Sequence, residues 1–146
     1  MASTGILAAI GSTPLVELKR LPPPGAARIL VKLESANPTG SMKDRVARAM
    51  IERAAADGRL RARDTVVEYT AGTTGISLAL VCAALGFKAH FVFSNAFSPD
   101  KRNTMRAYGA EITDVEAPGG QITAKLIKAL IGHHGFERYD RRRSPL

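Results

Sequence analysis

Short runs of β-branched and apolar residues alternate with longer helix-like segments along this chain, and that alternation most limits the folds open to it. Strands are expected at four such runs: Arg28–Glu34, Thr65–Tyr69, Ala89–Phe93 and Glu111–Val115. Helices are expected in the segments that follow them: Ser41–Asp57, Thr74–Leu85, Ser98–Tyr108 and Gln121–Ile131. Because strands joined through a helix run parallel, the pattern predicts an α/β fold in which helices flank a parallel sheet.

Capping residues mark the ends of the predicted helices. Ser41 and Ser98 are suited to cap the first turns of their helices, and Pro99 is suited to a first helical position. Three helices are each followed by a glycine that can end them: Gly58, Gly86 and Gly109. In the first helix, apolar residues at helical spacing predict one buried face: Val46, Ala47, Met50, Ile51 and Ala54. The segment Thr74–Leu85 is almost wholly apolar, so the whole helix is expected to be buried.

Length and composition fit one domain with a core of its own, since 45% of the 146 residues are hydrophobic. No apolar run approaches the roughly 20 residues of a membrane span, and the first residues lack the basic start of a signal peptide. The one cysteine, Cys82, excludes an internal disulfide, and no cysteine and histidine cluster has the spacing of a metal site. A cytoplasmic protein with no membrane partner and no bound metal is therefore expected.

The net charge of +8 raises the question of a nucleic-acid partner. The basic residues are dispersed, however, and their densest run is confined to residues 138–143, while only 5% of the residues are aromatic. A solvated basic surface is the better interpretation, and nucleic-acid binding is not expected. His133 and His134 are adjacent and point about 100° apart on a helix, so they are interpreted as surface residues. Cys82 lies among apolar residues and is interpreted as an inert buried thiol.

Two loops fall where strands end and helices begin, the edge of a parallel sheet at which ligands bind. The first, residues 35–45, places Lys43 in the first turn of a helix. The positive end of a helix dipole disfavours a second positive charge, so an uncharged amine is favoured there. An uncharged amine is the group that reacts with an aldehyde cofactor, although a lysine near a helix start is more often an exposed surface residue.

The second loop, residues 69–75, is rich in glycine and threonine. Gly72 and Gly75 would let backbone N–H groups approach an anion such as a carboxylate or phosphate, and the threonine hydroxyls add donors. The loop matches neither the Walker A motif nor the dinucleotide-binding glycine motif. The alternative interpretation is a tight turn that needs glycine for its backbone angles.

Taken together, the two loops make the chain resemble the pyridoxal-phosphate-dependent cysteine synthase family, fold-type-II enzymes that include cystathionine β-synthase and threonine dehydratase. The resemblance rests on the following segments: Ile10–Val16, Lys32–Glu34, Asn37–Arg45, Val67–Gly75 and Lys101–Glu111. It runs in order from about residue 9 to about residue 131.

The resemblance implies a role for each residue of the two loops. Lys43 would be the catalytic lysine that binds the cofactor, pyridoxal 5′-phosphate, and moves the substrate's α-proton. The α-carboxylate of a small amino-acid substrate would be held by residues of the second loop: Thr70, Ala71, Gly72, Thr74 and Gly75. Thr73 stands where the family's asparagine binds the cofactor ring, and Ala71 stands where the family has serine.

The resemblance also implies a domain organisation and an activity. Residues 1–34 would belong to the large domain, residues 35–131 would form the small domain, and residues 132–146 would be an atypical basic tail. The implied reaction is β-replacement on an activated serine in cysteine biosynthesis, by a homodimer. Nothing after Ile131 resembles the family's phosphate-binding cup, so the sequence predicts a truncated catalytic unit. The alternative function is a fragment without independent catalysis that binds cofactor weakly and acts at most as an association partner.

Overall fold

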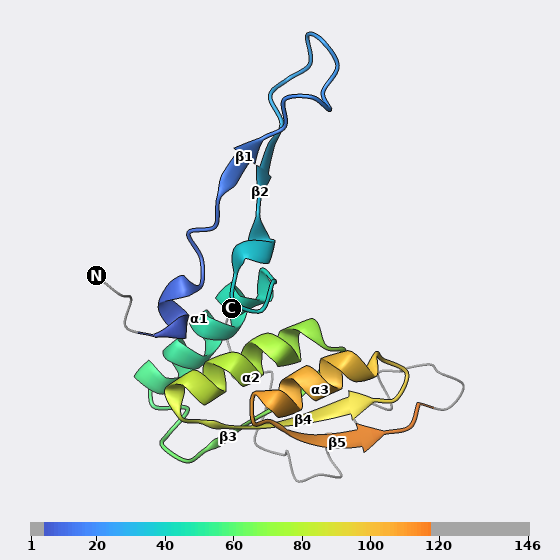
Figure 1. The fold of residues 1–146 in the computed structure, drawn as a ribbon. Coiled ribbons are helices and arrows are strands. Elements are labelled where there is room, and N and C mark those ends of the chain that lie inside the picture. The colour runs from blue at the N-terminus through green and yellow to red at the C-terminus, as the bar shows by residue number, and fades with distance from the viewer. Residues whose placement is uncertain (1–4, 118–146) are drawn as a thin grey trace.

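A three-stranded parallel sheet, with two helices on one of its faces, forms the centre of the protein. We describe a computed structural model in which residues 5–117 are placed. The strands lie in the order β3 (Thr65–Tyr69), β4 (Lys88–Ser94) and β5 (Glu111–Val115), and both neighbouring pairs are parallel. The connecting helices are α2 (Thr73–Leu85) and α3 (Pro99–Ala107), which lie on the same face of the sheet (Figure 1). The predicted α/β class with a parallel sheet is confirmed.

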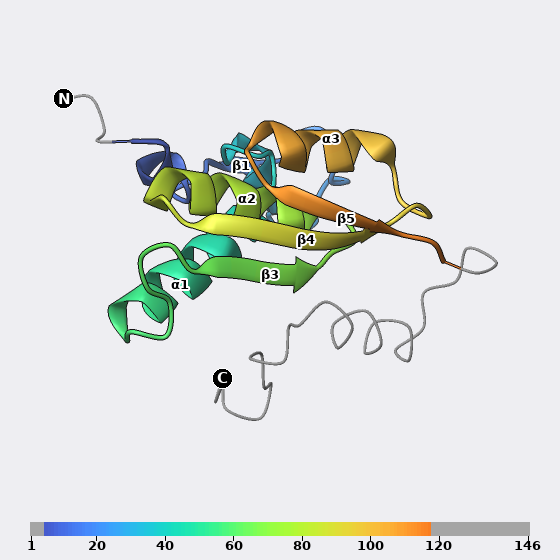
Figure 2. The same ribbon diagram turned by 90° about the horizontal axis from the view of Figure 1, so that it is seen from below.

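A third helix, α1 (Lys43–Ala56), packs along α2 beside the outer strand β3 (Figure 2). The face that α1 buries is narrower than the sequence predicts. Ala47 and Ile51 are buried, whereas Val46 and Met50 are 42% and 44% exposed. The reason is that α2 covers only one side of α1 in the described part of the chain.

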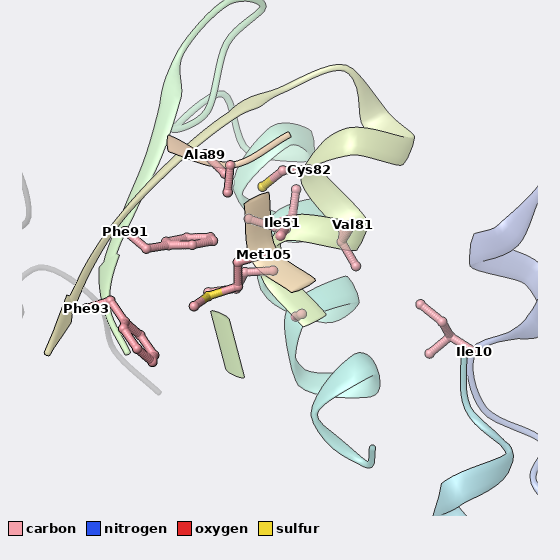
Figure 3. Close-up of a cluster of buried hydrophobic side chains, with 12 residues drawn as sticks. Ile10, Ile51, Val81, Cys82, Ala89, Phe91, Phe93 and Met105 are labelled. Atoms are coloured by element: carbon pink, nitrogen blue, oxygen red, sulfur yellow. The ribbon is translucent and has the colours of Figure 1, made fainter. Parts of the chain in front are cut away.

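The core lies between the sheet and the two helices above it (Figure 3). Phe91 and Phe93 point from β4 toward α2 and α3. Met105 of α3 is buried in the same cluster as these two rings. Among the described helices α2 is the most deeply buried, because its residues from Ser77 to Cys82 are all buried. The prediction that the whole helix is buried is wrong at its last turn, where Ala83, Ala84 and Leu85 are exposed. The sheet therefore holds α2 firmly, and α2 in turn provides the surface on which α1 rests.

The N-terminal part forms a separate antiparallel ribbon, which projects from the rest of the molecule (Figure 1). The ribbon consists of strands β1 (Leu15–Glu17) and β2 (Leu30–Lys32). A 3-10 helix η1 (Ile6–Ala9), which contacts α2, precedes it, and a second 3-10 helix η2 (Glu34–Ala36) follows it. The strand expected at Arg28–Glu34 is thus shorter, and it pairs with β1, which the sequence analysis missed. The segment between β1 and β2 contains no helix that could carry a parallel crossover, so the chain folds back antiparallel.

Helix ends follow the sequence closely but not in every detail. Gly86 adopts the left-handed conformation at φ 77°, and Phe87 N–H donates to Cys82 O at 2.9 Å, which ends α2. Helix α1 begins at Lys43 rather than Ser41, although the Ser41 hydroxyl accepts a hydrogen bond from Lys43 N–H at 3.1 Å. Ser98 precedes α3 as expected, but its side chain makes no capping hydrogen bond.

Some expectations concern residues outside the described range. The helix predicted at Gln121–Ile131, the tail at residues 132–146 and the two adjacent histidines His133 and His134 all lie there. Within residues 5–117, no helix combines the length and the apolar character required to cross a membrane.

Candidate functional site

Lys43 occupies the first position of α1, and its neighbours are held far more tightly than its own side chain. Lys43 is half-buried and makes no side-chain hydrogen bond or ion pair with any residue between 5 and 117. Asp44 and Arg45, the next two residues, each bind several partners. Within residues 5–117, the structure therefore presents an amine without a side-chain partner on a segment of backbone that is well anchored.

Arg45 ties this segment to the N-terminal ribbon through Glu34. Its Nε and Nη2 atoms donate to the two Glu34 carboxylate oxygens, each at 2.9 Å. The hydroxyl of Thr13 and the amide of Asn37 also donate to this carboxylate, at 2.8 Å each. These bonds, Arg45 first among them, lower the pKa of Glu34 from 4.5 to about 2. Glu34 is therefore ionised at neutral pH and anchors both ends of the lysine loop, residues 35–45.

Asp44 ties the same segment to α2. Its side chain is fully buried and accepts hydrogen bonds from the Thr39 amide at 2.8 Å, from the Thr39 hydroxyl and from the Ser77 hydroxyl at 2.6 Å. Ser77 is also fully buried and belongs to α2. Neither residue is predicted from the sequence as part of the site, although a serine inside an otherwise apolar helix is a signal that a buried polar partner exists.

The glycine- and threonine-rich loop follows β3 and leads directly into α2. Thr70 is 3% exposed, and its hydroxyl oxygen accepts hydrogen bonds from the amides of Gly72 and Gly75 at 3.1 and 3.0 Å. The amides of Ala71, Thr73 and Thr74 make no hydrogen bond to another described residue. Because they lie at the N-terminus of a 13-residue helix, these three donors are suited to bind an anion.

Packing inside the protein explains why position 75 is glycine. A Cβ atom there would collide with Thr70 Cγ2 and would lie 2.5 Å from the sulfur of Met105 in α3. The sequence leaves two interpretations of this glycine open, close approach of an anion or a tight turn. The structure adds a packing reason, since the glycine allows α2 to lie directly against Thr70 and α3.

Position 72 is different, because Gly72 has a φ of 135°, which side-chain-bearing residues rarely adopt. A Cβ atom there would also collide with the side chain of Lys101, whose Cγ would lie 3.1 Å away. Lys101, from α3, therefore lies over the loop. Lys101 begins the last of the segments that carry the family resemblance, but the sequence predicts no role for it.

The structure thus brings the two predicted loops together at one end of the sheet. Lys43 begins α1 and Thr73 begins α2, the two helices pack against each other, and the hydrogen bond between Asp44 and Ser77 joins them. An amine without a partner and a set of unused amides suit a ligand that carries an aldehyde and an anionic group.

Comparison with known proteins agrees with this chemistry. The family described as pyridoxal-phosphate dependent enzyme matches residues 6–136. A cysteine synthase of Staphylococcus aureus is 47% identical over 130 residues, which are 87% of this chain and 41% of that protein. The crystal structure of O-ureido-L-serine synthase superposes with a TM-score of 0.81 at 38% identity, over 92% of this chain and 43% of that one. O-acetylserine-dependent cystathionine β-synthase of Helicobacter pylori has a TM-score of 0.78 at 36% identity, over 91% and 44% of the two chains.

These similarities extend over nearly all of the described residues and include both loops. The chain spans about two-fifths of the length of the curated relatives it matches. Its fold and sequence match the corresponding part of fold-type-II enzymes, whose cofactor is pyridoxal phosphate. The chain therefore belongs to the family of pyridoxal-phosphate dependent enzymes and is a relative of the cysteine synthases.

Proposed function

We propose that this chain carries the lysine and the carboxylate-binding loop of a β-replacement enzyme that acts on an activated serine, as in cysteine biosynthesis. One observation carries the proposal: Lys43, without a partner among the described residues, begins a helix that is hydrogen-bonded to the helix beginning at the glycine- and threonine-rich loop. The names of the relatives support the substrate class, since one is a cysteine synthase, one an O-ureido-L-serine synthase and one O-acetylserine-dependent.

The cofactor would supply the electron sink that makes the α-proton of the amino acid acidic and lets the β-substituent leave. Lys43 would hold the cofactor and take the α-proton at its Nζ atom. The backbone amides of Ala71 and Thr74 would hold the substrate carboxylate, and the Thr73 hydroxyl would face the cofactor ring. Thr70, Gly72 and Gly75 would act by shaping the loop, since the Thr70 hydroxyl binds the amides of both glycines.

Reductive labelling tests this proposal on the whole 146-residue chain. After incubation with millimolar pyridoxal phosphate and reduction with borohydride, peptide mapping is expected to find the label chiefly on Lys43. The variant Lys43→Ala controls for background at the other lysines, among them Lys19, Lys32 and Lys88. Equal labelling of all lysines would refute the assignment of Lys43.

A second proposal concerns what the chain does alone: it acts as an association partner with negligible turnover of its own. One observation favours this, namely the exposed apolar side chains of α1 and the ribbon, among them Val46, Met50, Leu15 and Leu30.

The purified chain is therefore expected to show no stoichiometric cofactor absorbance and negligible formation of cysteine from O-acetylserine and sulfide. Tight cofactor binding with turnover would contradict this second proposal while supporting the first.

A further inference from the structure

The buried carboxylate of Asp44 has no part in the chemistry proposed above, yet it is the most completely enclosed charged side chain described. It is 0% exposed, and no described Lys, Arg or His forms an ion pair with it, since the neighbouring Arg45 binds Glu34. Burying a carboxylate is unfavourable unless hydrogen bonds replace its water. The direction of its few donors therefore determines where this side chain sits.

Those donors come from both sides of the candidate site. The amide and hydroxyl of Thr39 belong to the lysine loop, and the hydroxyl of Ser77 belongs to α2. The two hydroxyls also lie within hydrogen-bond distance of each other, at 3.2 Å. Asp44, Thr39 and Ser77 thus form one polar cluster, in which Asp44 and Ser77 are fully buried and Thr39 is partly exposed.

This cluster lies close to the first residues of both helices, α1 and α2. Asp44 directly follows Lys43 in the first turn of α1, and Ser77 lies four residues, about one turn, after Thr73 in α2. A first-turn aspartate commonly complements its own helix dipole. Asp44 additionally accepts a hydrogen bond from the hydroxyl of Ser77, which belongs to a different helix. Sliding of α2 along α1 would therefore break this bond.

We propose that Asp44 is a positioning residue, whose bonds to Thr39 and Ser77 hold Lys43 at a fixed place relative to the carboxylate-binding loop. This inference rests on the function proposed above for the two loops. It assigns Asp44 no contact with substrate or cofactor. Asp44 acts through the backbone of α1 and through the start of α2.

Hydrogen exchange of the ligand-free chain tests the link without any activity. In Ser77→Ala the Thr39 amide, 38 residues away, is expected to exchange about fivefold faster, because the loss of one donor weakens the hold on Asp44 by roughly 1 kcal/mol. Asp44→Asn is expected to speed exchange in both loops. Asp100→Asn is the matched control, since Asp100 also lies in the first turn of a helix but is exposed. It is expected to leave both loops unchanged.

Reductive labelling with pyridoxal phosphate provides the second readout. In Ser77→Ala the preference of the label for Lys43 over Lys88 is expected to fall several-fold, while the total label stays constant. Faster exchange confined to α2, or an unchanged preference for Lys43, would overturn the proposal. If the parent chain itself shows no preference for Lys43, the proposed function fails. In that case the exchange rate of the Thr39 amide in Ser77→Ala decides whether the link exists. If this amide exchanges no faster than in the parent chain, the inference is overturned as well.

Discussion

Arg45 and Glu34 form a double hydrogen bond across the base of the lysine loop, with both N···O distances at 2.9 Å. The carboxylate also accepts the hydroxyl of Thr13 and the amide of Asn37, so it joins the N-terminal ribbon to the start of α1. Both ion-pair partners are partly exposed: the side chain of Arg45 is 39% accessible and that of Glu34 is 25% accessible. The pair therefore contributes mainly by fixing the loop geometry, and its strength depends on pH.

Acid is expected to weaken this junction. The folded-state pKa of Glu34, about 2, lies below its ordinary value of 4.5. The stabilisation is therefore present above pH 4.5 and is lost as the pH falls from about 4.5 toward 2. Urea unfolding at a series of pH values should show a smaller loss of stability over this window in Glu34→Gln than in the parent. Identical pH profiles in the two proteins would contradict the assignment.

Gly75→Ala is expected to destabilise the fold by about 1–3 kcal/mol, because the added methyl group would overpack the contact with Thr70 and Met105. The gain in helix propensity, about 1 kcal/mol, is not expected to offset a collision with two buried side chains. Chemical denaturation measures the change. Ala71→Ser, at an exposed position of the same loop, is the control and should stay within about 0.5 kcal/mol of the parent.

Gly72→Ala is expected to destabilise for a different reason. Its φ of 135° is strained for any residue with a Cβ, which costs about 1–3 kcal/mol. The Lys101 side chain in its way is exposed and flexible, so it can move aside at little cost. Adding Lys101→Ala should therefore restore less than about 0.5 kcal/mol in thermal or urea unfolding. Full recovery in the double variant would show that the collision, rather than the backbone, dominates.

The Cys82 thiol is expected to resist alkylation in the native chain. Burial raises its pKa from 9.0 to about 11, so at pH 8 the reactive thiolate is about 100-fold scarcer than in the unfolded chain. Iodoacetamide labelling followed by mass spectrometry, with and without denaturing urea, measures the ratio of rates. Comparable rates in the two conditions would place Cys82 outside the core.

Much of the candidate site could be predicted from the sequence because its signals are local. The segment around Lys43 and the glycine- and threonine-rich loop are contiguous motifs that each lead into a helix, although the first follows η2 and the antiparallel ribbon rather than a strand of the parallel sheet. Their placement at helix N-termini follows from the alternation of elements. Ser77 carried a usable signal as a polar residue in an apolar helix, but that signal does not name its partner.

The sequence by itself determined the order of the elements from α1 to β5, the glycines that end α2 and α3, the positions of the two loops before α1 and α2, and the family to which the chain belongs. The elements, the glycines and the loop positions depend on the periodicity and backbone preferences of neighbouring residues, whereas the family follows from the resemblance of several motifs to those of known enzymes. Only the tertiary structure decided that Asp44 binds Ser77, that Gly75 makes room for Thr70 and Met105, and that β2 pairs with β1 rather than with the parallel sheet. Each of these depends on how elements pack in three dimensions. A hydrogen bond or a steric contact between residues far apart in the chain forms only after the helices and strands have docked.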